Sequence, residues 1–161
     1  MAAFTVWKFD TPAGASHAAG ILKQAATDHL VKVVDHAVVS WPAGASRPTT
    51  AHSHDNVRRG TGWGALWGLL AGALFLVPVV GGVVGAAIGA ISKATEGTGI
   101  TREQLETIRT EVTEGTSALF VVTEEGDLDR VGERFHGMHW KLITTNLTDA
   151  ERRVLHETFG G

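Results

Sequence analysis

Two histidines and an aspartate lie within four residues of one another, and these side chains are of the types that hold metal ions. They form the stretch His52-Ser53-His54-Asp55. Imidazole nitrogens and carboxylate oxygens are common ligands of divalent cations. Short polar loops often contain histidines that bind nothing, so we predict no metal site and no cofactor here. A metal- or ligand-binding sensor that uses His52 and His54 is kept as an alternative function.

Other patterns that could support catalysis are weak. His136 and His139 flank Gly137 and need not share one face of an element. The stretch Gly60-Thr-Gly-Trp-Gly64 follows no predicted strand, and neither a Gly-Lys-Ser/Thr nor a Gly-x-Ser-x-Gly motif occurs. The chain has no cysteine, which excludes thiolate nucleophiles and disulfides. We therefore expect a protein that is not an enzyme.

Size and charge narrow the class of protein further. The chain has 161 residues, enough for one domain with a sizeable core, and a formal net charge of -3. Proteins that bind nucleic acid by neutralising its phosphates carry a basic excess, so nucleic acid is not an expected partner. The first residues show no basic stretch followed by an apolar one, and we expect no secretory signal.

The most unusual feature is an apolar, glycine-rich segment, residues 60–92. It holds nine of the 20 glycines and no charged residue. One helix of this length would extend about 50 Å, whereas the hydrocarbon core of a bilayer is roughly 30 Å thick. Pro78 and Gly81-Gly82 lie near its middle, where they would break a helix. The segment therefore predicts a helical hairpin with two arms of about 22 to 27 Å.

Glycines recur every four residues along both arms of this glycine-rich segment. They are Gly60, Gly64, Gly68 and Gly72 on the first arm, and Gly81, Gly85 and Gly89 on the second. This small-xxx-small spacing lets two helices approach closely in lipid, as in a glycine zipper. The bulky side chains that we expect to meet lipid or neighbouring chains include Trp63, Trp67, Leu70 and Phe75. We predict that these eleven positions, together with Pro78, mediate oligomerisation or membrane contact.

The elements around this segment form two similar halves. In residues 1–41, a strand over 3–9, a helix over 13–30 and a strand over 31–41 with a possible break near Asp35 make a β-α-β half. Residues 42–59 are polar and are expected to form a linker.

In residues 100–161 a helix precedes a second β-α-β half. Thr101 and Gln104 predict a capping box, Ile100 and Leu105 a hydrophobic staple, and Gly115 the end of this first helix. A strand over 117–123, a helix over 127–135 and a strand over 139–145 follow. Thr148 and Glu151 predict a second capping box that opens a C-terminal helix.

These halves together predict an α+β fold. Two β-α-β units can build a ferredoxin-like sandwich of four antiparallel strands with helices on one face. The glycine-rich hairpin would interrupt this sandwich between its halves. If both halves form one sheet, the two ends of the hairpin must lie on the same side of any membrane.

Several of these residues resemble a known bacterial family. They are the block Gly62-Trp-Gly-Ala-Leu-Trp-Gly-Leu-Leu-Ala-Gly-Ala-Leu-Phe75, then Pro78, Gly81-Gly82, Gly85-Ala-Ala-Ile-Gly89, Gly99-Ile100 and the strand Gly115-Thr-Ser-Ala-Leu-Phe-Val-Val122. Together they are similar to the predicted membrane proteins grouped as domain of unknown function 1269, over most of the chain. This resemblance implies a small α+β domain that carries a glycine-rich apolar hairpin, and it implies no enzymatic activity.

The expected function is that of a membrane-associated homo-oligomeric scaffold. Its partners would be other copies of the chain and a lipid bilayer, with the α+β part in the cytoplasm. Trp63 and Trp67 beside Arg58 and Arg59 suit an interfacial belt with cytoplasmic cations, as does Lys93 at the other end. The alternative is a soluble, closed homo-oligomer whose hairpins point inward and shelter one another or an apolar cargo.

Overall fold

The computed structural model describes most of the chain outside the glycine-rich segment. The described residues are 3–45, 48–52, 67, 70, 93, 97–126, 128–135, 138–146, 148, 150, 151, 153, 154 and 157. Along the chain, the elements are β1 (Ala3–Phe9), α1 (Gly14–Thr27), β2 (Val31–Ser40), β3 (Thr49–His52), α4 (Arg102–Glu111), β4 (Ser117–Gly126), α5 (Leu128–Arg134) and β5 (Trp140–Asn146). The predicted alternation of strands and helices in both halves is thus confirmed.

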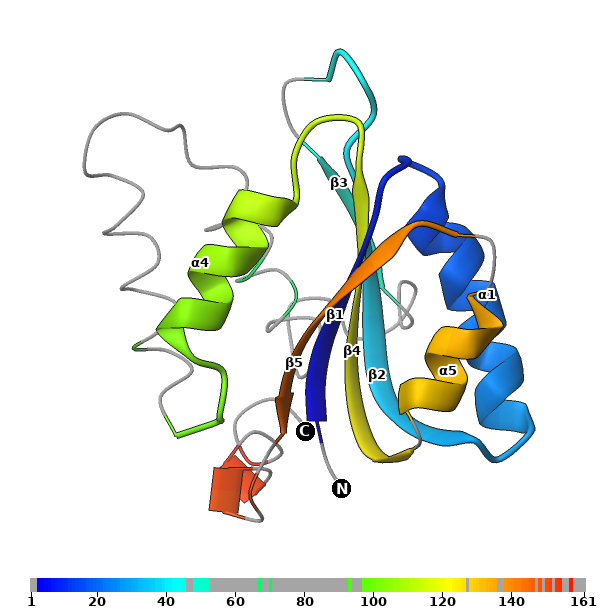
Figure 1. Cartoon of the computed structure of the whole chain (residues 1–161). Helices are drawn as coiled ribbons and strands as arrows, with labels where there is room; N and C mark the ends of the chain where they lie inside the picture. Colours follow the sequence, from blue (N-terminus) through cyan, green and yellow to red (C-terminus); the bar gives the residue numbers. More distant parts are fainter. Residues whose placement is uncertain are drawn as a thin grey trace.

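All five strands form one sheet, in the order β3-β2-β4-β1-β5. Every neighbouring pair is antiparallel. The central strand β4 comes from the second half of the chain and lies between β1 and β2 of the first half, as Figure 1 shows. The protein is therefore an α+β protein in which residues on both sides of the glycine-rich segment build the same sheet.

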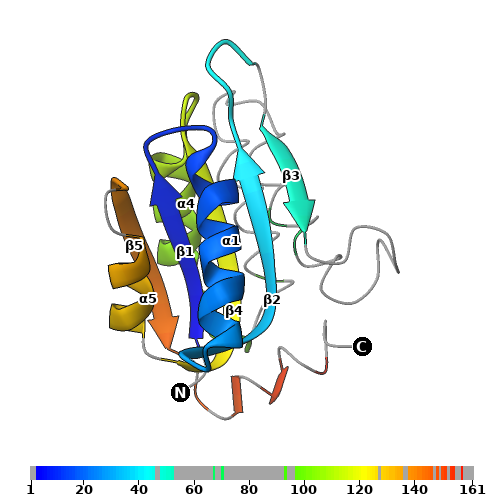
Figure 2. The same cartoon turned by 90° about the vertical axis from the view of Figure 1, so that its right-hand side faces the viewer.

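One face of the sheet is covered by α1 and α5, which lie side by side in Figure 2. Alternate residues of the strands point to this face, because successive side chains of a strand point in opposite directions. We call the cluster they form the α1/α5-side core. Its buried residues are Trp7, Phe9, Ala15, Ala18, Ala19, Leu22, Ala25, Val31, Leu119, Val121, Val131 and Phe135.

The opposite face carries α4, which corrects the expectation that the helices cover one face only (Figure 1). Leu105, Ile108 and Val112 follow helical spacing and are buried against the sheet. The α4-side core consists of these three residues and of Phe4, Val6, Ala37, Val39, Trp67, Leu70, Ile100, Ala118, Phe120, Val122 and Ile143. Because an uncovered sheet face would leave this apolar surface in water, the additional helix completes a three-layer arrangement.

The predicted polar linker contains a strand. Residues 49–52 form β3, which pairs with Ala37–Ser40 of β2. The two strands are joined through a turn in which Gly44 has a φ of 85°, a conformation that glycine adopts without steric cost. The polar residues of this region were interpreted as a linker, and the strand was therefore not predicted. An edge strand needs apolar residues on one face only.

Three helix ends differ in how they are capped. Thr101 caps α4, since its side chain accepts a hydrogen bond from the Gln104 backbone N–H at 3.1 Å. The second bond of the predicted capping box would join the Gln104 side chain to the Thr101 backbone N–H. It is replaced, because the Gln104 side chain points into the core. Thr148 and Glu151 make both bonds of their box, at 2.9 and 3.2 Å. The helix α4 ends at Glu111 rather than at Gly115, whose φ of 85° forms the turn into β4.

The first helix is capped from a distant part of the chain. Ala13 at its N-cap position has no side chain that could accept a hydrogen bond. Instead, the Ser117 hydroxyl of β4 accepts a bond from the Ala15 backbone N–H at 2.9 Å and donates one to the Thr11 carbonyl at 2.6 Å. This contact joins α1 to the centre of the sheet.

Candidate functional site: where the glycine-rich segment meets the sheet

The structure describes two residues of the glycine-rich segment, Trp67 and Leu70. Both have helical backbone and are almost fully buried in the α4-side core. The other predicted contact positions lie outside the described residues; they are Gly60, Trp63, Gly64, Gly68, Gly72, Phe75, Pro78, Gly81, Gly85 and Gly89. The predicted hairpin shape and glycine packing therefore stay predictions.

Trp67 and Leu70 were expected to face lipid or another chain, and the structure places them against their own sheet. A segment tethered to both sides of a domain has a high effective concentration near it. The apolar face beside α4 is then the nearest surface on which such side chains can leave water. In this arrangement the two residues contribute to the chain's own core.

A β-bulge in β2 shapes the surface that they meet. The pairing between β2 and β4 shifts between Val33 and Asp35, so that Val34 is an additional residue in β2. Val34 packs against the α4-side core, and Asp35 lies opposite Val122, whose side chain belongs to the same core. Asp35 alternates with Ala37 and Val39 of the same core, so its carboxylate lies on the α4 face, directly beside the bulge.

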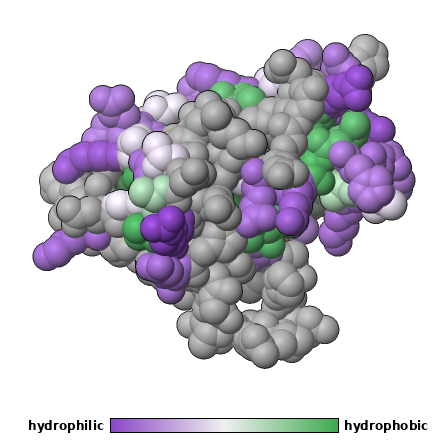
Figure 3. Space-filling view, turned by 90° about the horizontal axis from the view of Figure 1, so that it is seen from below, coloured by the Kyte–Doolittle hydropathy of each residue, from purple (hydrophilic) through white to green (hydrophobic). Residues whose placement is uncertain are grey.

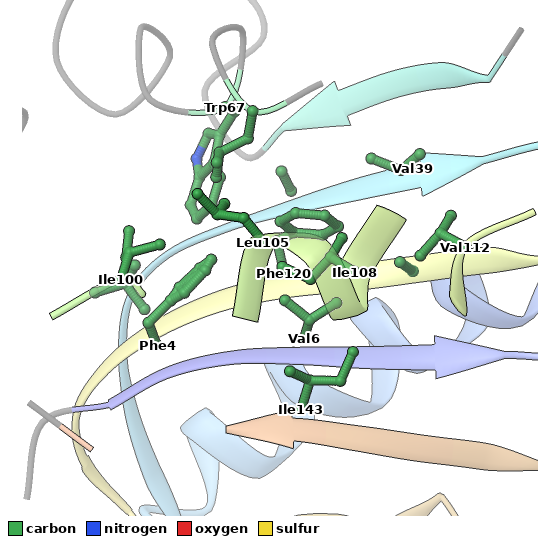
Figure 4. Packing of buried hydrophobic residues seen from close by; sticks show 14 residues of the cluster. Phe4, Val6, Val39, Trp67, Ile100, Leu105, Ile108, Val112, Phe120 and Ile143 are labelled. Atoms are coloured by element: carbon green, nitrogen blue, oxygen red, sulfur yellow. The ribbon is translucent and has the colours of Figure 1, made fainter. Parts of the chain in front are cut away.

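Trp67 contacts this carboxylate directly. Its indole Nε1 donates a hydrogen bond to Asp35 Oδ2 at 3.0 Å, and both residues are at most 3% exposed. The Trp67 ring also meets Phe120 edge to face, with 6.3 Å between centroids and 87° between planes. Figure 4 shows Trp67 on the side of the core toward β3, with Ile143 of β5 on the opposite side. We call Asp35 and Phe120 the docking site.

A second buried polar group lies in the same row of the sheet. Phe4 of β1 is paired with Val122, which is paired with Asp35. The Gln104 side chain of α4 donates from Nε2 to the Phe4 carbonyl at 3.4 Å. Its Oε1 atom is buried and has no hydrogen-bond partner. Since buried acceptors are nearly always paired, this end of the α4-side core is not optimised for stability alone.

These side chains are suited to recognition of a helix. A buried carboxylate needs donors, and an indole N–H supplies one while its ring fills apolar space. An aliphatic side chain at position 67 would fill the space without satisfying Asp35 in the same way. The docking site therefore selects an aromatic donor, and Leu70 packs into the same core.

Sequence analysis missed this site although one signal was present. Asp35 is a lone acid in a strand of mostly apolar residues, and it was noted only as a possible break in the strand. The structure shows an irregular but continuous strand with a buried carboxylate beside the irregularity. β-Bulges often lie next to functional sites, because they change the direction of a side chain.

The predicted histidine cluster is mostly outside the described part of the chain. His52 is the last residue of β3, while Ser53, His54 and Asp55 are not described. Within the described ranges, no group of three or more histidine, cysteine or acidic residues could hold a metal ion. A hollow of about 290 Å³ beside α1 and β2 is lined by Leu22, Lys23, Ala26, Val33, Val34, Asp35 and His36.

On the face that Figure 3 shows, the described residues are mostly hydrophilic, with small hydrophobic areas between them. Trp140 is the exposed large hydrophobic residue found among the described positions. Among these same positions, no helix has the length and apolar character needed to cross a membrane.

The fold and the docking site define a class of protein: an α+β domain whose antiparallel sheet receives side chains of a glycine-rich segment inserted between β3 and α4. The family described as protein of unknown function (DUF1269) matches residues 61–160. The chain belongs to this family. The matched range starts at the glycine-rich segment, so β1, α1, β2 and β3 lie before it. Comparison with curated proteins and with solved structures found no match.

Proposed function

We propose that this protein is a non-enzymatic scaffold that associates with membranes and with other copies of itself through its glycine-rich segment. The observation that carries the proposal is that strands from both sides of this segment form one sheet, with helices on both faces. A domain can therefore be built around the segment, which leaves most of its 33 apolar or small residues for contacts elsewhere.

For the domain itself we propose a ferredoxin-like arrangement of β1, β2, β4 and β5. The order β2-β4-β1-β5 and the two β-α-β units with α1 and α5 on one face support it. In such a domain, β3 extends the sheet and α4 is an addition that covers the second face. The ends of the glycine-rich segment then share one side of a membrane, which we propose to be the cytoplasmic side.

Oligomerisation would use the two glycine rows. Glycines spaced four apart form a groove on a helix, and a neighbouring helix can approach its backbone closely there. Bulky residues between the glycines, such as Trp63 and Phe75, would then face lipid. The absence of charge between Gly60 and Ser92 supports this environment, because charged side chains are costly within a bilayer.

Flotation in a density gradient tests membrane association. We expect the protein from a detergent-free lysate to float with lipid. If it sediments as one large, discrete species, the membrane proposal is wrong and a closed soluble assembly replaces it.

Substitution of the glycines tests the oligomer contact. Replacing Gly68 and Gly72 together by leucine should reduce the size of the detergent-solubilised oligomer, because two β-carbons with branched side chains would separate the helices. Gly20→Leu is the matched control, since a side chain at this exposed position of α1 meets no atom within 4 Å. Unchanged oligomer size in the double variant would contradict the glycine contact.

A further inference from the structure

Docking of Trp67 on the sheet limits what the rest of the glycine-rich segment can reach. Leu70 and Ile100 both belong to the α4-side core, so the chain is held at the domain at both positions. Only residues 71–99, 29 in number, lie between them. Of these, residues 71–92 are uncharged, and their 22 residues suffice for about one helical crossing of a bilayer. The docked chain therefore keeps too few uncharged residues to cross a membrane and return.

Release from the docking site frees the first arm as well. The whole uncharged stretch, residues 60–92, then supplies the 33 residues of the predicted hairpin, whose two short arms can enter a bilayer that thins locally. The rings of Trp67 and Phe120 cannot remain in contact while Trp67 is within lipid. The docked and the membrane-crossing arrangements thus exclude each other.

We propose that the hydrogen bond between Trp67 and Asp35 is an autoinhibitory latch. It holds Trp67 and Leu70 on their own sheet and thereby opposes insertion of the glycine-rich segment into a membrane. This inference rests on the proposed function, because the latch regulates the same segment that is proposed to contact lipid.

The chemistry of the pair supports this role over simple packing. Replacing a buried carboxylate and its donor by apolar side chains often preserves or increases stability, so such a pair contributes specificity rather than stability. Here the pair distinguishes Trp67 from the many leucine, valine and alanine side chains of the segment. A polar pair is also a contact that lipid tails cannot replace, which opposes transfer of this helix turn into a membrane.

The size of the effect follows from the type of bond. A hydrogen bond to a charged group shifts an equilibrium about tenfold to a hundredfold. Trp67→Phe keeps an aromatic ring against Phe120 and removes only the N–H donor. Asp35→Asn keeps the size of the side chain and removes its charge. Each variant should increase the undocked population by about this factor.

Binding of the full-length chain to phosphatidylcholine vesicles tests the latch. We expect Trp67→Phe and Asp35→Asn to increase the ratio of vesicle-bound to free protein by about tenfold or more. Trp41→Phe is the control, because it makes the same change at an indole that donates to the Ala45 carbonyl at 2.9 Å, away from Asp35. This control should bind vesicles as the unchanged protein does.

A measurement without lipid separates the latch from the proposed function. Hydrogen exchange of the Trp67 indole N–H, followed by NMR, should be slow in the unchanged chain and at least tenfold faster in Asp35→Asn. Equal exchange in both would overturn the latch. If exchange differs but neither protein binds vesicles, the latch holds and the membrane function is wrong. If the unchanged protein binds vesicles and Trp67→Phe binds them no better, the latch is wrong.

Discussion

The two faces of the sheet are covered in different ways. On one face, α1 and α5 each connect two strands of the sheet, so the segments that cover this face are close in sequence to the strands they cover. On the other face, α4 is joined by two residues of the glycine-rich segment, which reach the sheet from between β3 and α4. Helices α1 and α5, which connect strands of the sheet, cover one face. Helix α4 and residues of the inserted glycine-rich segment cover the other.

The buried polar groups of the two faces differ as well. On the α1/α5 side, the buried Ser117 hydroxyl makes two hydrogen bonds that join α1 to β4. On the α4 side, the buried Asp35 carboxylate accepts from Trp67, and Gln104 has a buried oxygen without a partner. Such an unpartnered buried atom is uncommon and is more frequent in functional regions. The comparison teaches that the α1/α5 side supports the fold, whereas the α4 side combines packing with recognition of the segment.

Truncation of two neighbouring residues of β4 tests this comparison most strongly. Leu119 points to α1 and α5, and Phe120 points to α4. Phe120→Ala should lower the free energy of unfolding by about 3–5 kcal/mol and Leu119→Ala by about 2–5 kcal/mol. Only Phe120→Ala removes the ring that Trp67 contacts, so it alone should speed exchange of the Trp67 indole N–H beyond the global effect. Urea denaturation measures the unfolding free energy, and NMR measures the exchange rate of the Trp67 indole N–H. If both variants speed this exchange equally, the division between the faces is wrong.

Crowding at the first turn of α1 gives the next largest effect. A β-carbon on Gly14 would lie 2.6 Å from Cβ of Phe9, an atom attached to the β1 backbone. Gly14→Ala should lower the free energy of unfolding by about 1–3 kcal/mol, because the close-packed α1/α5 side cannot yield. Gly20→Ala, in the same helix with nothing within 4 Å, should raise it by about 0.5–1 kcal/mol. If thermal denaturation shows that both substitutions change the unfolding free energy in the same direction, this explanation is wrong.

Removing one polar side chain from each face should have opposite results. Ser117→Ala leaves the Ala15 N–H without its partner and should cost about 1–3 kcal/mol of unfolding free energy. Gln104→Leu removes a buried, unpartnered oxygen and should raise the unfolding free energy by about 1 kcal/mol. Chemical denaturation of the two variants measures this difference. A destabilising Gln104→Leu would show that its weak bond to Phe4 matters more than the unpartnered oxygen.

The smallest effect concerns acid stability of the α1/α5 side. Arg134 of α5 donates to the Asp28 carboxylate at the end of α1, at 2.7 Å, and lowers the pKa of Asp28 below its ordinary value of 3.8. A lowered pKa in the folded state stabilises the fold above pH 3.8, and this contribution is lost as the pH falls through the lowered value. Arg134→Ala should return the pKa of Asp28 toward 3.8 in an NMR titration. Lys8→Ala, which removes the partner of Asp10, should leave the titration of Asp28 unchanged.

Much of the fold followed from local patterns. The strand at residues 3–9 and the helix that follows it were predicted from residue types and spacing, and the structure confirms both. The caps at Thr101 and Thr148 were predicted because a capping residue and its target are at most three positions apart. Such features depend on neighbours in the sequence, which is why they can be read without knowing the rest of the fold.

The candidate site was harder to predict from the sequence. Trp67 and Leu70 were predicted to contact lipid or another chain, and the surface they contact in this structure is their own sheet. Identification of Asp35 required knowledge of the core that its strand position faces, which its pairing with Val122 supplies. Hydrophobic patterns indicate which side chains leave water and do not indicate which surface receives them.

The amino-acid sequence by itself determined the α+β class, the order of the main elements, the caps at Thr101 and Thr148 and the apolar character of residues 60–92. Only the tertiary structure decided that β3 extends the sheet, that Ser117 caps α1 and that Trp67 binds Asp35. The first group depends on residues a few positions apart. The second depends on contacts between segments separated by many residues, whose pairing is chosen by the packing of the whole domain.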